Sequence, residues 1–179
     1  MKINMGCGWR NFGSDWVHID GGKYDHLDYH DICVLPFEND SVDIIYASHV
    51  IEYFNRTELA EMLDEWKRVL KPGAILRVAV PDFEALAKLY VAENDFTLDN
   101  LVGPLFGQMP MGKQTIYHRT VYDFVSLKKV LLESGFHGIR KFEWRDTDHA
   151  HHDDHSQAYF PHMDKVSGTL VSLNVEGVK

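Results

Sequence analysis

Two short stretches near the start of the chain decide the fold: residues 3–8 read INMGCG and residues 16–20 read WVHID. Each begins like a short buried strand and ends where the chain must turn. Gly6 and Gly8 let the backbone turn tightly after the first strand and approach a ligand closely. Asp20, after the second strand, is placed to accept hydrogen bonds from ribose hydroxyls. Together these residues predict a nucleotide-binding edge at the carboxyl ends of two strands.

The distance between these stretches is short for a dinucleotide-binding enzyme. Gly8 and Asp20 are 12 positions apart, whereas such enzymes usually place the acid about 20 residues beyond the glycine loop. A full helix does not fit between the strands, and Arg10 stands where a third glycine would be expected. A NAD-dependent oxidoreductase is therefore disfavoured, because the helix N-terminus that would bind the pyrophosphate is missing or very short.

The rest of the chain favours an α/β fold. Further strands are expected over residues 26–30, 42–47, 74–80, 138–144 and 169–175, helices over 56–70, 83–92 and 123–134, and a turn over 71–73. Alternating strands and helices favour a Rossmann-like, doubly wound, mostly parallel sheet. The last two strands are joined by a loop alone, which favours an antiparallel C-terminal strand. Residues 94–120, which include Gly112, and residues 146–165 are expected to be irregular, the former with short helical turns.

Composition places the chain among ordinary globular domains. Its 179 residues, 45% of them hydrophobic, suit a single domain over residues 1–179. The formal charge of −9 argues against a nucleic-acid partner, which would need a basic face. The two cysteines have no metal-ligand spacing, and neither a signal peptide nor a membrane-length apolar stretch is evident. We therefore expect a cytoplasmic protein with no nucleic-acid or membrane partner and leave its oligomeric state open.

Four ordered stretches carry a resemblance to a known family. They are INMGCG, WVHID, DICVLPFENDSVDIIYASHVIEYF (residues 31–54) and RVLKPGAILRVAVPD (residues 68–82). Together they resemble class I S-adenosylmethionine-dependent methyltransferases, and within them the compact branch often associated with sugar and surface-polysaccharide modification. The resemblance implies trimmed early helices, S-adenosyl-L-methionine as the cofactor, and methyl transfer to a hydroxyl or amine of a small-molecule or glycan acceptor.

The resemblance also implies cofactor contacts at ten positions. The glycine turn would pass beneath the methionine part, Asp20 would hold the ribose, Asp31 and Ile32 would border the adenine, and His49 would lie near the sulfonium. The full set is Met5, Gly6, Cys7, Gly8, Trp9, Asp20, Asp31, Ile32, Ser48 and His49. For Cys7 a packing role is favoured over a nucleophilic one, because nothing nearby in the sequence would stabilise a thiolate.

Methyl transfer from a sulfonium needs alignment of the acceptor and, for a hydroxyl, removal of its proton. The candidate catalytic residues are His49, Glu52, Asp82 and His118, with His49 the first choice as base. Asp82 fits a helix N-cap equally well. His118 and Arg119 could instead meet an anionic acceptor or form an ordinary surface pair.

Five histidines lie within residues 149–162: His149, His151, His152, His155 and His162. The favoured interpretation is a substrate loop over residues 146–165 that shares acceptor recognition with residues 94–120. A metal centre stays open, since His151, Asp153 and His155 alternate as on one face of a strand, but no metal ligand is assigned. A pH-sensitive surface is a third interpretation. His162, inside the apolar YFPHM, is expected to be packed. A module that binds the cofactor without transferring a methyl group is the remaining alternative function.

Overall fold

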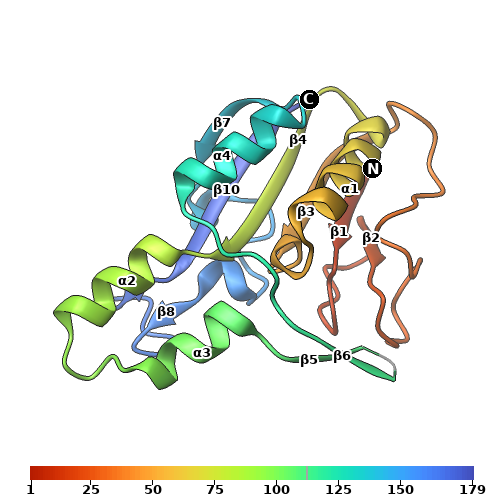
Figure 1. Ribbon diagram of the computed structural model, residues 1–179. Coiled ribbons are helices and arrows are strands. Elements are labelled where there is room, and N and C mark those ends of the chain that lie inside the picture. Colours follow the sequence, from red (N-terminus) through yellow and green to blue (C-terminus); the bar gives the residue numbers. More distant parts are fainter. Residues whose placement is uncertain (112) are drawn as a thin grey trace.

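The computed structural model describes residues 1–111 and 113–179, so the expectation for Gly112 lies outside the described residues. A six-stranded sheet with the order β2-β1-β3-β4-β10-β7 forms the centre of the molecule (Figure 1). The strands are β1 (Lys2–Met5), β2 (Trp16–Ile19), β3 (Val42–Ser48), β4 (Leu70–Pro81), β7 (His137–Lys141) and β10 (Ser172–Val178). Strands β1 to β4 are parallel, and β10 is antiparallel to both β4 and β7. The predicted mostly parallel sheet with an antiparallel C-terminal strand is confirmed.

One face of this sheet is apolar and is covered by helices α1 (Arg56–Val69) and α4 (Phe124–Glu133) (Figure 1). Asn55 caps α1 as predicted, because its side chain accepts the amides of Thr57 and Glu58 while Glu58 reaches back to the Asn55 amide. The core between sheet and helices is continuous; it includes Ile3, Ile45, Leu76, Val78 and Val175 from the strands and Leu63, Trp66, Leu127 and Leu131 from the helices. Burial of each such large side chain contributes about 1.5–3 kcal/mol.

The opposite face carries a row of polar side chains across all six strands. Strand register places the following residues side by side in this order: His18, Asn4, Tyr46, Arg77, Glu176 and Arg140. Glu176 is buried and accepts hydrogen bonds at 2.8 Å from both Arg77 and Arg140. Side chains alternate between the two faces of a strand, so these six polar side chains all lie on the face opposite the apolar core. Where they are buried, they need hydrogen-bonding partners.

Among the described residues, Phe12, Phe142 and parts of residues 146–165, the His-rich segment, pack over this polar face. The Tyr46 hydroxyl donates to the Asp154 carboxylate at 2.6 Å, and the His149 ring lies 3.9 Å from the Tyr46 ring. The Phe12 ring stacks on His152 at 4.2 Å. The His-rich segment thus occupies the place of the helices that the short β1–β2 connection leaves out, and the predicted trimming of the early helices is confirmed.

The other elements lie at the carboxyl end of β4 and beyond it. Helix α2 (Phe83–Ala92) packs with α3 (Leu98–Phe106) through a small apolar cluster that includes Leu86, Leu89 and Phe96. A hairpin of β5 (Met109–Met111) and β6 (Gln114–Ile116) follows α3. The shorter elements are the 3-10 turns η1 (Ile51–Tyr53), η2 (Trp144–Asp146) and η3 (His155–Gln157) and the strands β8 (Tyr159–Phe160) and β9 (Thr169–Leu170).

Several expectations from the sequence are corrected. The expected strand over 138–144 ends at Lys141, and the one over 169–175 is divided between β9 and β10. Residues 26–30 form only one bridge, between Ile19 and Tyr29, instead of a third strand, because Asp28 turns back to accept the His18 amide. The expected turn at 71–73 belongs to β4, which begins at Leu70 with a register irregularity opposite β3. Residues 94–120 contain a regular helix and a hairpin; Thr97 caps that helix and Gly107, with a positive φ, ends it.

No helix in the residues that the structure describes is long and apolar enough to span a membrane.

Tyr46→Phe tests whether the cover over the polar face depends on the Tyr46–Asp154 hydrogen bond. The change leaves Oδ2 of the buried Asp154 carboxylate without its donor, and we expect the free energy of unfolding to fall by about 1.5–3 kcal/mol in urea denaturation. As a control, Tyr90→Phe removes the hydroxyl group of a half-exposed tyrosine in α2. This variant should change the free energy of unfolding by less than about 0.5 kcal/mol. Equal stability of the two variants would contradict this role.

Candidate active site

A cleft of about 420 Å³ opens at the carboxyl ends of β1, β2 and β3, where ligands bind in open α/β sheets. Its walls also include residues from α3, from the segment around β5 and β6, and from the C-terminal part of the His-rich segment. The predicted site residues that line it are Gly6, Gly8, Trp9, Asp20, Ser48, His49 and His118. The structure therefore brings most of the predicted cofactor contacts and two of the predicted catalytic residues to one place.

The glycine turn after β1 is in close contact with Val50, the second residue after β3. Gly6 and Gly8 have φ values of +63° and +58°, a region that costs other residues energy. A Cβ atom at Gly6 would lie 2.3 Å from Cγ2 of Val50, whereas one at Gly8 would meet no atom within 4 Å. Of these two positions, both favour glycine because of the backbone conformation, and Gly6 also has no space for a side chain.

Asp20 is a fixed acceptor in the wall of the cleft. Its Oδ2 accepts the Gly8 amide at 2.8 Å and its Oδ1 accepts the Gly22 amide at 2.6 Å. Each carboxylate oxygen can accept a second hydrogen bond, so the side chain retains acceptor capacity although it is held rigidly. A carboxylate fixed beside a glycine turn fits the ribose hydroxyls of S-adenosylmethionine.

Glu52, in η1, lies between two histidines that line the cleft. Its Oε1 is 3.5 Å from Nδ1 of His49 and 3.8 Å from Nε2 of His118. Among the described residues, neither carboxylate oxygen of Glu52 has a hydrogen-bond partner, and Nε2 of His49 has none either. His49 itself has a φ of +55°, a strained conformation of the kind that clusters at functional sites.

Burial disfavours the charged form of every group in this cluster. It raises the pKa of Glu52 to about 8 and holds the pKa of His49 well below its ordinary value. The pKa of His118 is also lowered by burial. At neutral pH the cluster therefore contains a protonated carboxyl group and two neutral imidazoles. Buried titratable groups with displaced pKa values at a cleft are typical of functional sites.

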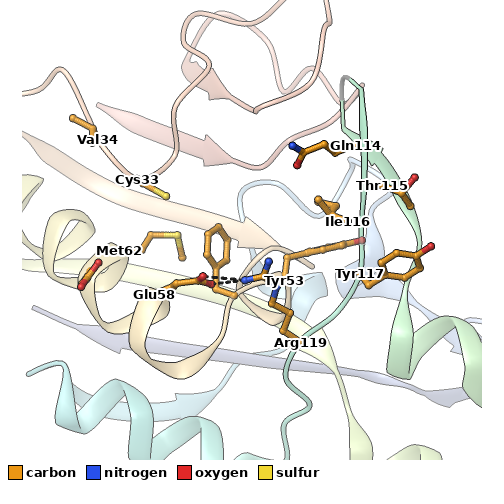
Figure 2. A pocket seen from close by; sticks show the side chains of 12 residues that line it. Cys33, Val34, Tyr53, Glu58, Met62, Gln114, Thr115, Ile116, Tyr117 and Arg119 are labelled. Carbon is orange, nitrogen blue, oxygen red and sulfur yellow. Dashed lines mark hydrogen bonds and ion pairs between the residues drawn. The ribbon is translucent and has the colours of Figure 1, made fainter.

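The residues predicted to border the adenine lie outside the cleft, beside a second cavity of about 640 Å³ (Figure 2). The Asp31 carboxylate accepts the amides of Cys33 and Val34, and these two residues line the cavity. Tyr53 lines both the cleft and the cavity. The two hollows are therefore neighbours, and Asp31 and Ile32 stay predicted adenine contacts.

Arg119 faces the second cavity, where it is paired. Its guanidinium donates to both oxygens of Glu58 at 2.9 Å, as the dashed lines in Figure 2 show. His118 turns the other way: its Nδ1 lies 3.0 Å from the carbonyl oxygen of Pro104, and its ring lines the cleft. His118 and Arg119 therefore face different hollows, His118 the cleft and Arg119 the second cavity. A single anionic acceptor in the cleft would meet His118 and not Arg119.

Asp82, Cys7 and Met5 also lie outside the cleft. The Asp82 carboxylate caps α2 by accepting the amides of Glu84 and Ala85, and its catalytic role stays a prediction. Cys7 is buried, and burial raises the pKa of its thiol to about 12, which agrees with a packing role. Met5 is buried in the core beneath the glycine turn.

The His-rich segment divides its histidines between packing and the cleft. His149 and His152 pack against Phe12, whereas the His155 ring lies 4.8 Å from the His49 ring at the cleft. His162 is exposed, so the expected packing is wrong. The expected strand-like alternation over 151–155 is also wrong, because this stretch is a turn leading into η3. In residues 1–111 and 113–179, no group of three or more His, Cys, Asp or Glu side chains is arranged to hold a metal ion.

Several cleft residues were not predicted individually from the sequence, and Arg10 and His155 are the charged or titratable ones that lie near His49. Arg10 lines the cleft, donates from Nε to the Asp153 carbonyl at 2.9 Å, and stacks over the Trp9 ring. Its place in GCGWR, where a third glycine would stand, was the available signal. His155 reaches the cleft because Asp154 is held by Tyr46, a contact over 108 positions that no local pattern indicates.

Comparison with known proteins agrees with this geometry. The family model described as "Methyltransferase domain" matches residues 15–78. A S-adenosylmethionine-dependent methyltransferase from Archaeoglobus fulgidus has a TM-score of 0.59 at 13% identity, with 99% of this chain and 85% of that chain covered. One from Methanosarcina mazei has a TM-score of 0.58 at 17% identity, with 99% and 91% covered. The chain has the fold of S-adenosylmethionine-dependent methyltransferases.

A further structural neighbour comes from Haloferax volcanii and was solved in complex with the Trm112 methyltransferase activator. It has a TM-score of 0.54 at 18% identity, with 99% of this chain and 81% of that chain covered. The comparison with curated proteins finds no match. The family match and the shared fold support an enzyme of the methyltransferase class with S-adenosylmethionine as its cofactor.

Gly6→Ala, compared with Gly8→Ala, separates the effect of space from that of backbone conformation. Both variants place a side chain at a positive φ, at a cost of about 1–2 kcal/mol, but only the Gly6 variant collides with Val50. We expect Gly6→Ala to lower the free energy of unfolding by clearly more than Gly8→Ala, measured by urea denaturation. Val50→Ala should recover part of the loss in the Gly6→Ala background and none in the Gly8→Ala background. Equal losses in the two glycine variants would contradict the close contact.

Glu52→Gln tests the burial of an unpaired carboxyl group. In the native protein Glu52 stays protonated up to about pH 8, whereas in the unfolded chain it ionises near pH 4.5. Wild-type stability therefore falls between these pH values, at up to about 1.4 kcal/mol per pH unit. The glutamine variant lacks this loss, so its stability relative to wild type should rise from pH 4.5 to pH 8. A difference that does not change with pH would show that Glu52 titrates normally in the native protein.

Proposed function

We propose that this chain, as a single methyltransferase domain, transfers a methyl group from S-adenosylmethionine to a hydroxyl or amine of a small-molecule or glycan acceptor. One observation carries the proposal: the fixed Asp20 carboxylate and the imidazoles of His49 and His118 line the same cleft at the carboxyl edge of the sheet, and Glu52 is buried behind the two imidazoles. Asp20 can hold the cofactor, and His49 and His118 offer neutral imidazoles to an acceptor.

The residues after β1 and β2 would hold the cofactor. The backbone of Gly6, Cys7 and Gly8 would pass beneath the methionine part, and Asp20 would accept the ribose hydroxyls. Asp31 and Ile32, beside the second cavity, would border the adenine. When bound, S-adenosylmethionine supplies an electrophilic methyl group. Ser48 and His49 would lie next to it, since both line the cleft beyond the glycine turn.

His49 is the proposed base for a hydroxyl acceptor. Its imidazole is kept neutral by burial, and its Nε2 is a buried nitrogen with no hydrogen-bond partner within the described residues, so this atom would take the proton of an acceptor seated against the ring. The strained backbone of His49 is fixed by a hydrogen bond from its amide to the Ala79 carbonyl at 2.8 Å. His118 lines the same cleft and is the second candidate for holding or orienting the acceptor.

Residues 94–120 and 146–165 supply most of the wall on the acceptor side in this proposal. From these segments, Met109 gives apolar surface and His118 and His155 offer hydrogen bonds, and Tyr24 and Tyr53 add aromatic surface from outside them. Such a mixture suits the hydroxyl-bearing rings of sugars and related small molecules. A cytoplasmic location also belongs to the proposal, and it is supported by the free thiols of Cys7 and Cys33.

Calorimetric titration with S-adenosylmethionine and S-adenosylhomocysteine tests cofactor binding. We expect both ligands to bind the wild type, and Asp20→Asn to weaken both by about 10-fold or more through lost charge-assisted hydrogen bonds to the ribose. Asp15→Asn changes an exposed aspartate between β1 and β2 and should bind like wild type. Circular dichroism melts will show whether Asp20→Asn is folded.

A labelled methyl group then tests turnover with panels of sugars, polyols and amines as acceptors. Methylated product that depends on His49 would support the enzyme. Binding without product for any acceptor class would favour the cofactor-binding module, and a wild type that binds neither ligand would refute the proposal.

A further inference from the structure

A buried carboxyl group stands directly behind the wall of the cleft. Glu52 is only 1% exposed, and neither of its carboxylate oxygens has a hydrogen-bond partner among the described residues. Its position is nevertheless fixed, because its backbone carbonyl accepts the amides of Arg119 and Thr120. An isolated buried carboxyl group is costly, so its presence beside a ligand cleft indicates a role that appears when the cleft is filled.

The titratable groups that face Glu52 come from the elements packed around η1. His49, at the end of β3, and His118, after β6, approach Oε1 at 3.5 and 3.8 Å. Tyr53 and Tyr122 are the other titratable neighbours, and burial, with a smaller effect of Glu52, raises the pKa of both hydroxyl groups to about 12. Across the described residues, the side-chain nitrogens of these two histidines lie within 4.0 Å of the Glu52 carboxyl group, and no lysine or arginine nitrogen does.

Two arginines lie near the cluster: Arg119, whose guanidinium is paired with Glu58, and Arg10, which lines the cleft. The charge of Arg10 lowers the pKa values of His49 and His155 but is not a cause of the pKa shift at Glu52. The two imidazoles between Glu52 and the cleft are neutral because burial lowers their pKa values. Within the part of the chain that the structure describes, no positive charge therefore compensates an ionised Glu52 in the free protein. A cation bound on the cleft side of His49 and His118 would do so.

We propose that Glu52 is the buried counter-ion of a cationic group bound in the cleft, and that this cation is the sulfonium of S-adenosylmethionine. The inference rests on the proposed function. His49 and His118 each touch Glu52 and also line the cleft, so one side chain separates the carboxyl group from a bound ligand. A charge at that distance in a buried setting is weakly screened.

Binding of the sulfonium would then be coupled to loss of a proton. In the free protein Glu52 is protonated, since burial raises its pKa to about 8. A cation in the cleft favours the carboxylate, so the O–H bond breaks and the proton passes to solvent. After methyl transfer the product is a neutral thioether, and the carboxylate takes up a proton again. The arrangement favours the cofactor over its product and assists product release.

Calorimetric titrations at pH 7 in phosphate and in Tris measure this coupling, because the two buffers differ in their heats of ionisation. We expect wild-type protein to release about half a proton or more with S-adenosylmethionine and close to none with S-adenosylhomocysteine. The release should disappear above about pH 9, where Glu52 is already ionised. This comparison uses only the wild-type protein and so does not depend on any variant being folded.

Glu52→Gln should abolish the proton release and reduce the preference for S-adenosylmethionine over S-adenosylhomocysteine by about 5-fold or more. Glu133→Gln, which changes an exposed glutamate at the end of α4, should keep both at wild-type values. Equal proton release with the two ligands, or release that persists in Glu52→Gln, would overturn the assignment of Glu52 while cofactor binding stands. Absence of binding by either ligand would instead overturn the proposed function and this inference with it.

Discussion

The Tyr46 hydroxyl donates a buried hydrogen bond to Asp154, and the second layer of the molecule depends on this contact. One face of the sheet carries polar side chains on every strand, and buried polar groups must find partners. The connection between β1 and β2 is too short to provide a helix. The His-rich segment takes that place, with Asp154 on Tyr46 and the Ser156 carbonyl accepting from Asn174 at 2.9 Å.

The same contacts that complete the fold also complete the cleft. Asp154 caps η3 by accepting the Ser156 amide at 2.8 Å, and this turn places His155 beside His49. On the other side of the cleft, the contact between Gly6 and Val50 joins the turn after β1 to the segment after β3. That segment continues into η1 and Glu52. The cleft is therefore fixed from two sides, by the His-rich segment and by the contact between the turn after β1 and the segment after β3. These contacts explain how the site forms without helices between the first strands.

Local patterns predicted the elements whose residues act within a few positions of one another. The apolar runs of β3 and β4, the Asn55 cap of α1 and the glycine turn after β1 all have strong signals of this kind. The prediction of a third strand over residues 26–30 was wrong because of the Asp28 side chain. Its carboxylate accepts the His18 amide, which a neighbouring strand would otherwise have bonded. Helix α3 was missed because Gly103 and Pro104 obscured the capping box formed by Thr97 and Asn100.

The site was predictable where it follows strand ends and unpredictable where it depends on distant contacts. Gly6, Asp20 and His49 each come directly after a strand, so the parallel sheet brings them together. Arg10 and His155 join them through contacts with Asp153 and His49, which lie about a hundred positions or more from their partners in the sequence. The approach of His118 to Glu52 also joins residues far apart in the sequence, and only the structure shows that the carboxyl group is buried without a hydrogen-bond partner among the described residues.

A crystal structure with S-adenosylhomocysteine bound tests the central claim most directly. We predict the ribose hydroxyls on the Asp20 carboxylate and the thioether sulfur in the cleft between Gly6 and His49, with His118 and His155 on the open side where an acceptor would enter. A ligand seated elsewhere, or one whose ribose makes no contact with Asp20, would contradict the account.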